Sequence, residues 1–585
     1  MSDFLYSTKK IEQKMIYKVF KNIYKNEKTN LKYYQGTWGS LAISQNTYNG
    51  FEPLETEEFI TVVVGGPLLM FRDNSFITIK ESNEGTKSIF NRWLNGKINW
   101  NEDFSGPFHI LIINKKERTC LSVTDIMSFV PVYYFNNEKN SYICSHVDML
   151  AEVSGDKENL DEISLIDFIL HGVVTYPYTF YKNIKQLQPA STHKINVNKL
   201  RTNSYWIPIE ENSYSSINEA ADDIRKNLIK YINKITSETT NIAQFISGGE
   251  DSRTLSGLLK DINRDAFIYL DSMNREGKLA KRITENYNAT FNLRTRTYTH
   301  YLDILPECAS LVGTGSEYHH AHTYGFHKEI ERYDAVFGGL FSDALLKGAR
   351  IKKHIWTIKL PFLSEIKDRS FSNSNKLKVN LFDEKQIKEL TLRRQEHLDF
   401  ICQFRNDSAE EWFELWPSSM NRNIPNVHAN RRLFKSYEPF LSNEIVKISA
   451  RVNQSWKLNR KLFHKSVKPF LKPSKWIFHS NGWLPYYSWK PNILIHFTTW
   501  TFRQFGIRLG IIKGNQGPWT EWRSLITTND WNDSIQSYLS NTTILSSELK
   551  ANIENVLKNN SLAVLQYIAL TQVLYETSVL SQNNE

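Results

Sequence analysis

Cysteine is scarce in this chain, and the few that occur form no pattern. Cys120, Cys144, Cys308 and Cys402 include no C-x-x-C pair. The sequence therefore predicts neither a disulfide framework nor a zinc site built from cysteines. Such usage is typical of a reducing compartment, so we expect a cytoplasmic protein.

Long apolar runs are also missing. The N-terminal stretch MSDFLYSTKKIEQ lacks the apolar core of a secretory signal, and no run of eighteen apolar residues predicts a membrane span. The nearest candidate, residues 493–512, is interrupted by histidine, arginine and glutamine. We predict a helix packed in the protein core there, with peripheral contact with a membrane as the alternative.

The charge balance is mildly basic. Lys and Arg number 72 against 62 Asp and Glu, a formal net charge of +10 spread over 585 residues. Because these basic residues are dispersed, they favour attraction for an anionic substrate such as ATP over a nucleic-acid partner. A composition with 41% hydrophobic and 23% charged residues indicates a globular protein. The length of the chain predicts several domains.

The first third of the chain has the pattern of a β-rich domain. Residues 157–171 predict one amphipathic helix, and the polar stretch 208–216 predicts a linker. Short, partly alternating runs bounded by turn residues predict strands at 59–64, 75–80, 108–114, 132–135, 141–145 and 193–197.

After the linker, strands alternate with helices. We predict helices at 217–235 and 278–287, and strands at 242–246, 266–270 and 334–337. This order predicts a doubly wound parallel sheet that binds ligands at the carboxyl ends of its strands. Beyond about residue 385 the pattern is mainly helical.

The motif richest in chemistry is Ser247-Gly248-Gly249-Glu250-Asp251-Ser252, between a strand and a helix. Adjacent glycines let backbone N–H groups approach a phosphate, and the helix N-terminus favours the anion. Asp251 would repel phosphates unless a cation lay between them, so the motif predicts Mg²⁺ held by Asp251 and a polyphosphate.

A second motif, Gly338 to Asp343, follows the last predicted strand of the same sheet. Ends of neighbouring strands meet at one crevice, so Asp343 is expected to complete the magnesium site with Asp251. Gly338 and Gly339 would let the backbone lie against the nucleotide.

Four features together resemble the asparagine synthetase family, which joins an Ntn-type glutamine amidotransferase domain to a PP-loop ATP pyrophosphatase domain. They are SGGEDS at 247–252, GGLFSD at 338–343, Gly106-Pro107-Phe108 with Asp125 and 131–134, and Glu438 to Leu441 with Lys475 and Gly482. The resemblance implies Ntn-like β-sandwich layers over residues 1–210, an α/β PP-loop domain over 211–490 and a helical extension over 491–585.

The resemblance also implies a reaction. A carboxylate attacks ATP with Mg²⁺ bound, giving an acyl-adenylate and pyrophosphate, and an amine then displaces AMP. Lys475, Asp251 and Asp343 are the catalytic residues it implies; a solvated surface lysine is the alternative for Lys475. The implied ATP- and pyrophosphate-binding residues are Ser247, Gly248, Gly249, Asp251, Ser252, Leu270, Gly338 and Gly339.

The chain departs from the family at its N-terminus. Position 2 is Ser rather than the nucleophilic Cys, and the pattern after it favours a polar helical stretch over a strand. Ser128 replaces the glycine that follows the family's aspartate. We therefore expect a degenerate amidotransferase-like domain without glutaminase activity. The nitrogen would come from ammonia, a separate glutaminase or an amine of the substrate.

Two further residues are candidate substrate contacts. Arg253 could reach a phosphate or an acidic substrate, or pair with Glu250. Glu317 lies near His319, His320 and His322; a segment lining the substrate pocket is favoured there over a metal site.

The leading hypothesis is thus an amide-forming ligase acting on aspartate, a sugar uronic acid or a peptide carboxylate. The alternatives are a non-catalytic nucleotide-binding regulator or scaffold, and a tRNA-modifying enzyme, which the β-rich domain before the loop disfavours. A homodimer is left open.

Overall fold

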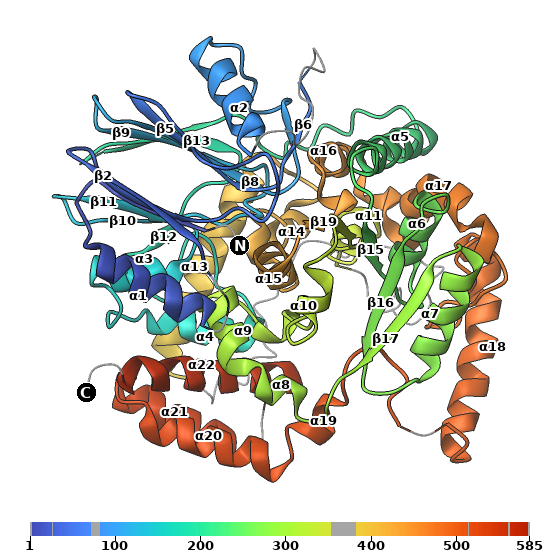
Figure 1. Ribbon diagram of the computed structural model, residues 1–585. Coiled ribbons are helices and arrows are strands. Elements are labelled where there is room, and N and C mark those ends of the chain that lie inside the picture. Colours follow the sequence, from blue (N-terminus) through green and yellow to red (C-terminus); the bar gives the residue numbers. More distant parts are fainter. Residues whose placement is uncertain are drawn as a thin grey trace.

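The computed structural model describes residues 3–25, 27, 29–71, 82–197, 199–352, 382–512, 514–559 and 562–582 (Figure 1). Its N-terminal part contains two six-stranded antiparallel sheets. The first has the order β12 (Lys185–Gln186), β10 (Tyr133–Asn136), β11 (Ser141–Cys144), β1 (Phe4–Ser7), β3 (Gly39–Ser44), β2 (Leu31–Gly36). The second has the order β14 (Leu200–Ser204), β13 (Ser191–Ile195), β9 (Thr119–Thr124), β8 (Phe108–Asn114), β5 (Phe59–Gly65), β4 (Leu54–Glu55).

These sheets pack face to face. Alternation along β1 sends Phe4 and Tyr6 into a buried cluster shared with β5 and β8, while Leu5 faces helix α1 (Gln13–Tyr24) on the outside. Helix α2 (Glu84–Leu94) packs on the outer face of the second sheet. The layers are therefore helix, sheet, sheet, helix, which confirms the predicted β-sandwich layers.

Most of the strands predicted in this part are found within a few residues of their expected bounds. The strand expected at 75–80 lies outside the described residues. The helical stretch expected after Ser2 is wrong at its start, because β1 begins at Phe4 and pairs with β3 and β11 before α1 begins.

The second part is built on a five-stranded parallel sheet. Its order is β17 (Thr290–Thr295), β16 (Asp265–Leu270), β15 (Ile242–Phe245), β18 (Ala335–Phe337), β19 (Ser436–Tyr437). Helices α5 (Ile217–Thr236), α6 (Glu250–Leu258) and α7 (Arg275–Asn286) cover one face. The opposite-facing side chains Ala243, Phe267 and Val336 join a large core cluster. The predicted doubly wound parallel sheet is confirmed.

The rest of the chain is mainly helical. Between the sheets and after them lie α3 (Val147–Ser154), α4 (Glu162–His171), α8 (His300–Asp303), α9 (Leu305–Val312), α10 (His327–Ile330), α11 (Ser342–Leu346), α13 (Glu384–Cys402), α14 (Ala409–Phe413), α15 (Ile424–Leu433), α16 (Asn443–Arg451) and α17 (Lys461–Val467). The C-terminal helices are α18 (Trp489–Arg508), α19 (Trp522–Leu525), α20 (Asn529–Asn541), α21 (Ser547–Lys558) and α22 (Val564–Gln582).

The last helix is part of the core. Helix α22 contacts α4, α9 and α20. The indole of Trp531 on α20 is fully buried and donates to Thr571 of α22 at 3.1 Å. The helical extension is therefore packed on the earlier parts of the chain.

Helix α18 contradicts the prediction for residues 493–512. Instead of packing in the core, it lies at the outer edge of the molecule at the right of Figure 1. Of its residues only Asn492 is buried, and the side chains of Leu494 and Phe502 are 70% and 77% exposed. Across the described ranges, no helix has both the length and the apolar character to cross a lipid bilayer.

Candidate functional site

The loop Ser247–Ser252 joins β15 to the first turn of α6, as predicted. Its amides point at oxygen atoms: Gly248 N–H donates to Glu276 Oε1 at 2.7 Å, and Gly249 N–H donates to Ser247 Oγ at 3.1 Å. Burial raises the pKa of Glu276. The loop therefore turns its N–H groups inward toward acceptors, as an anion-binding turn requires.

The glycine pair after β18 allows two close approaches. A Cβ atom at Gly339 would lie 2.8 Å from Cβ of Asp251, and one at Gly338 would overlap the carboxylate of Glu438. That carboxylate accepts the N–H of Leu340 at 2.9 Å. Burial raises the pKa of Glu438 to about 8. Both glycines are thus needed for packing, one against each carboxylate residue.

The two predicted aspartates converge on one cation. Nζ of Lys347 lies 2.6 Å from Asp251 Oδ1 and 2.7 Å from Asp343 Oδ1, and the Ser342 hydroxyl donates to Asp251. Burial raises the pKa of Asp251, and the ammonium opposes that effect. Burial disfavours the charged amine of Lys347, but the aspartates outweigh it, so the pKa of Lys347 is raised.

Lys347 is a site residue that the sequence interpretation missed. It follows Asp343 by four residues, the spacing that places two side chains on one face of a helix. Because α11 is only five residues long, this periodicity is too short to stand out.

The same two carboxylates fit a magnesium ion. Carboxylate oxygens are the ligands that Mg²⁺ prefers, and Asp251 and Asp343 already share a single positive charge. Held there, the ion would neutralise charge on a diphosphate leaving group.

A cavity of about 400 Å³ opens beside these groups. It includes five predicted site residues: Ser247, Asp251, Ser252, Gly339 and Asp343. Apolar and aromatic walls come from strands β15 and β16, and the opposite side is formed by Arg296, His322, Asn421, Pro518 and Trp519. A pocket with aromatic walls and an acidic end next to a glycine-rich loop suits a nucleotide.

The far wall of this cavity was not predicted. Its Trp519 ring packs edge-on against His322, with centroids 5.6 Å apart. Arg296 donates to Asp271 Oδ1 at 3.0 Å and to the Pro518 carbonyl at 2.7 Å. The contacts of Trp519 with His322 and of Arg296 with Pro518 join segments about 200 residues apart in the chain, so no local pattern could reveal them.

Seven other predicted residues do not line the cavity, among them Gly248, Gly249, Gly338 and Glu317. Leu270 is buried at the end of β16. The guanidinium of Arg253 is buried and donates to the carbonyls of Ile477 and Gly248 at 2.7 and 3.2 Å. Lys475 is exposed, with Nζ above the Trp476 ring at 5.6 Å.

The predicted pairing of Arg253 with Glu250 is wrong, whereas its contact with a phosphate or an acidic substrate stays a prediction. Arg253 bonds to backbone carbonyls instead of facing the cavity, and Glu250 pairs with Arg460. The role of Arg253 here is to hold the segment around Ile477 against the loop.

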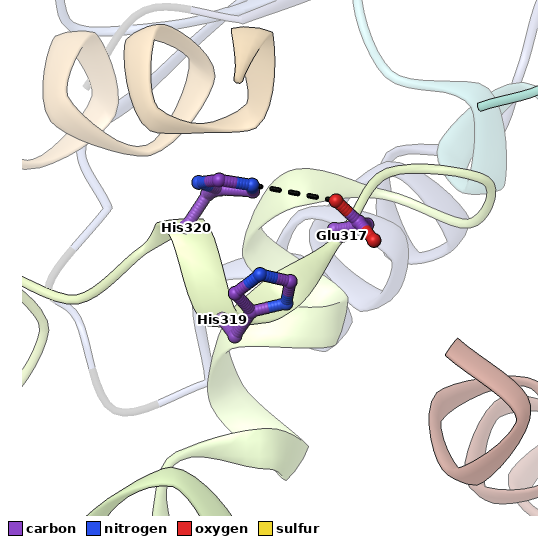
Figure 2. A group of neighbouring side chains, drawn as sticks. All are labelled: Glu317, His319 and His320. Carbon is purple, nitrogen blue, oxygen red and sulfur yellow. Dashed lines mark ion pairs between the residues drawn. The ribbon is translucent and has the colours of Figure 1, made fainter. Parts of the chain in front are cut away.

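Glu317, His319 and His320 gather at a short 3-10 turn (Tyr318–His320), as Figure 2 shows. Their ligand atoms lie within 4.8 Å of one another, so they could hold a metal ion. The carboxylate already has partners, because His320 Nε2 lies 3.3 Å away and Arg422 bonds to both of its oxygens.

Burial and these partners shift the pKa values of Glu317 and His319. Burial raises the pKa of Glu317, but the histidines and Arg422 outweigh it and bring that pKa to about 2. Burial lowers the pKa of His319 to about 3. His319 and His320 pack against Trp519 of the cavity wall, and the Glu317 carboxylate is occupied by ion pairs. Contact between Glu317 and a substrate stays a prediction.

The start of the chain is tied to the second part by a buried ion pair. Asp3 is fully buried, and both of its oxygens accept from Arg432 of α15, at 2.7 and 3.0 Å. Arg431 lies 3.2 Å from the same carboxylate. Burial raises the pKa of Asp3, but the two arginines outweigh it and hold the pKa well below its usual range.

The comparisons with known proteins agree with the fold of the first part. Residues 80–206 match the glutamine amidotransferase domain. A stretch of 182 residues, 30% of this chain, is 22% identical to a protein of Methanocaldococcus jannaschii provisionally named asparagine synthetase (glutamine-hydrolyzing) 2. The aligned stretch covers 35% of that protein, so the chain spans about a third of the length of this relative. The chain is a distant homologue of it over part of its length.

Two solved structures are also similar. One is described as the allosteric regulatory enzyme of purine biosynthesis (10% identity, 50% of this chain and 80% of the other, TM-score 0.24). The other is glutamine phosphoribosylpyrophosphate amidotransferase from B. subtilis (9% identity, 50% and 65%, TM-score 0.24). At this TM-score neither likeness supports an inference about activity.

Proposed function

We propose that this protein is an ATP-dependent amide-forming ligase of the asparagine synthetase type. The observation that carries the proposal is the convergence of Asp251 and Asp343 on one cation, at the carboxyl ends of two parallel strands and on the wall of one cavity. The distant similarity to an asparagine synthetase supports the same reaction class.

In this proposal the cavity binds ATP with its phosphates at the Ser247–Ser252 loop. The loop amides donate to the phosphate oxygens, which replace Glu276 and Ser247 as acceptors. Asp251 and Asp343 hold Mg²⁺, and Lys347 adds positive charge beside them. A substrate carboxylate attacks the α-phosphorus, pyrophosphate leaves, and an amine then displaces AMP to form the amide.

Loss of glutaminase activity is part of the proposal. Cys120, Cys144 and Cys308 are buried, and burial raises the pKa of each thiol, which disfavours a thiolate nucleophile. The amine is then ammonia, the product of a separate glutaminase, or an amine of the substrate. The acid is aspartate, a sugar uronic acid or a peptide carboxylate.

A second candidate is a non-catalytic nucleotide-binding scaffold. The exposure of Lys475, away from the cavity, favours it, because the family's reaction implies a lysine that contacts the reacting groups.

The two candidates differ in turnover. Purified protein is incubated with ATP, Mg²⁺, ammonia and pools of carboxylic acids, and AMP and pyrophosphate are quantified by chromatography. We expect equal amounts of both products with the correct acid. ATP binding by calorimetry without AMP from any acid pool would favour the scaffold.

A further inference from the structure

Helix α18 presents large apolar side chains to solvent. We define the α18 surface as the exposed side chains of Leu494, Phe497, Trp500, Phe502, Phe505, Ile507, Leu509 and Ile511. The most exposed are Phe502 at 77% and Ile511 at 75%. Single exposed apolar residues are ordinary, but eight within eighteen positions form a patch that marks a contact with another surface.

One side of the helix carries the centre of this patch. Leu494, Phe502, Phe505 and Leu509 are separated by eight, three and four residues, so they recur on the same face. The exposed side chain of Arg508 comes from the last turn of the same helix. Exposed aromatic and aliphatic side chains beside basic residues suit contact with a surface that is apolar inside and anionic outside.

Two threonines of α18 form hydrogen bonds inside the helix. The hydroxyls of Thr498 and Thr501 donate to the carbonyls of Leu494 and Phe497, at 3.0 and 2.8 Å. Such back-bonded threonines do not depend on water for their hydrogen bonds. The helix can therefore enter a poorly hydrated environment without stranding these donors.

The charge of this region is of one sign. No Asp or Glu occurs between Glu444 and Glu521, whereas thirteen Lys and Arg residues do. Lys472, Lys475 and Lys490 are exposed there, as are Trp476 and Phe478. Some basic residues of this stretch are paired inside the fold, such as Lys457 with Glu411, but Lys472, Lys475, Lys490 and Arg508 are exposed and have no acidic neighbour in the sequence.

From these observations we infer that the α18 surface docks the protein on the interface of an anionic lipid bilayer. The basic residues meet the anionic headgroups, and the phenylalanine and leucine side chains enter the acyl boundary. A second copy of the chain is a poorer occupant, because a symmetric contact would place two acid-free, basic regions against each other.

The docking surface is connected to the loop and to the cavity wall through two sets of contacts. In the middle of α18, Thr499 donates to the Gly482 carbonyl at 2.8 Å, and the adjacent Trp483 donates to Glu250 of the loop at the same distance. After the helix, the segment 515–519 is held by Asn274 and Arg296 and leads to Trp519 in the cavity wall. Hydrogen bonds therefore join the α18 region to the candidate site.

Sedimentation with sucrose-loaded vesicles tests the inference on the full chain. Vesicles of phosphatidylcholine alone are compared with vesicles that also contain phosphatidylglycerol. We expect binding to the anionic vesicles, weakening as salt rises, and at least about tenfold weaker binding for the double variant Phe502→Ser/Phe505→Ser. Leu392→Ser, at an exposed site on α13, is the matched control and should bind as the wild type does.

Two results would overturn the inference. One is wild-type protein that stays in the supernatant with anionic vesicles, or a double variant that binds them unchanged. The other is self-association of the wild type without vesicle binding, measured by light scattering and abolished in the double variant; this would assign the surface to contact between copies. Because Phe502, Phe505 and Leu392 are all exposed, the double variant and the Leu392→Ser control should both keep the wild-type melting temperature.

Discussion

Nζ of Lys347 lies 2.6 Å from Oδ1 and 2.8 Å from Oδ2 of Asp251, so one ammonium group spans both oxygens of that carboxylate. In a nucleotide site this places a fixed positive charge where the charge of a leaving pyrophosphate would develop. Several measurable consequences depend on this pair and on the groups around it.

Replacing Asp251 with Asn should abolish ATP turnover. The amide keeps the size of the side chain but cannot hold Mg²⁺ as a carboxylate does, so we expect AMP formation to fall at least about a hundredfold. Circular dichroism should show an intact fold. Asp261→Asn, at an exposed site after α6, is the control. Turnover at the wild-type rate in Asp251→Asn would refute its magnesium role.

We expect substitutions of Lys347 and of Lys475 to have different effects on the rate of AMP formation. Lys347 contacts both aspartates, so Lys347→Met should reduce AMP formation by about tenfold or more. Lys475 is exposed and outside the cavity, so Lys475→Met should change the rate by less than about threefold. Steady-state rates at saturating ATP and Mg²⁺ decide between them. A large loss in Lys475→Met alone would restore the role that the family resemblance implies.

Gly339→Ala should disturb both stability and ATP binding. The new methyl group would lie 2.8 Å from Cβ of Asp251, so one of the two segments must shift. We expect a loss of about 1–3 kcal/mol in the free energy of unfolding, together with a higher KM for ATP. Gly517→Ala, where a Cβ meets its nearest atom at 3.6 Å, should leave both values nearly unchanged.

Glu438 should make the protein less stable as the pH rises. Burial raises its pKa to about 8, so between about pH 4.5 and pH 8 the folded state holds a proton that the unfolded state has lost. Stability falls with pH across this window. The free energy of unfolding is measured with urea at about pH 5 and at about pH 9. Between these two pH values it should fall by roughly 2–4 kcal/mol more in the wild type than in Glu438→Gln. Parallel profiles for the two proteins would mean that Glu438 is ionised in the fold.

Glutamine should not serve as a nitrogen donor. Three of the four thiols are buried with raised pKa values, so no glutamate should be released from glutamine, while ammonia should support the reaction. Glutamate is measured by mass spectrometry. Its ATP-stimulated release would show that the first part of the chain retains glutaminase activity.

The predicted features that the structure bears out are those encoded by neighbouring residues. Strands β15, β16 and β18 and the turn at Ser247–Ser252 depend on short apolar runs and adjacent glycines, and each was predicted within about two residues. Lys347 was missed because α11 is too short for a periodic signal. Helix α18 was placed wrongly because an apolar helix has the same periodicity whether protein or another surface covers it.

The large core cluster has a consequence for how this chain can vary. Leu5 of the first sheet, Val336 of the parallel sheet and Leu574 of α22 belong to the same buried cluster. The Gln572 side chain bonds to Ser316 and Tyr318, directly beside the histidine turn. The three regions of the chain are therefore not exchangeable modules. A chain shortened before α22 or recombined near residue 210 would expose this shared interior and lose the support of the cavity's far wall.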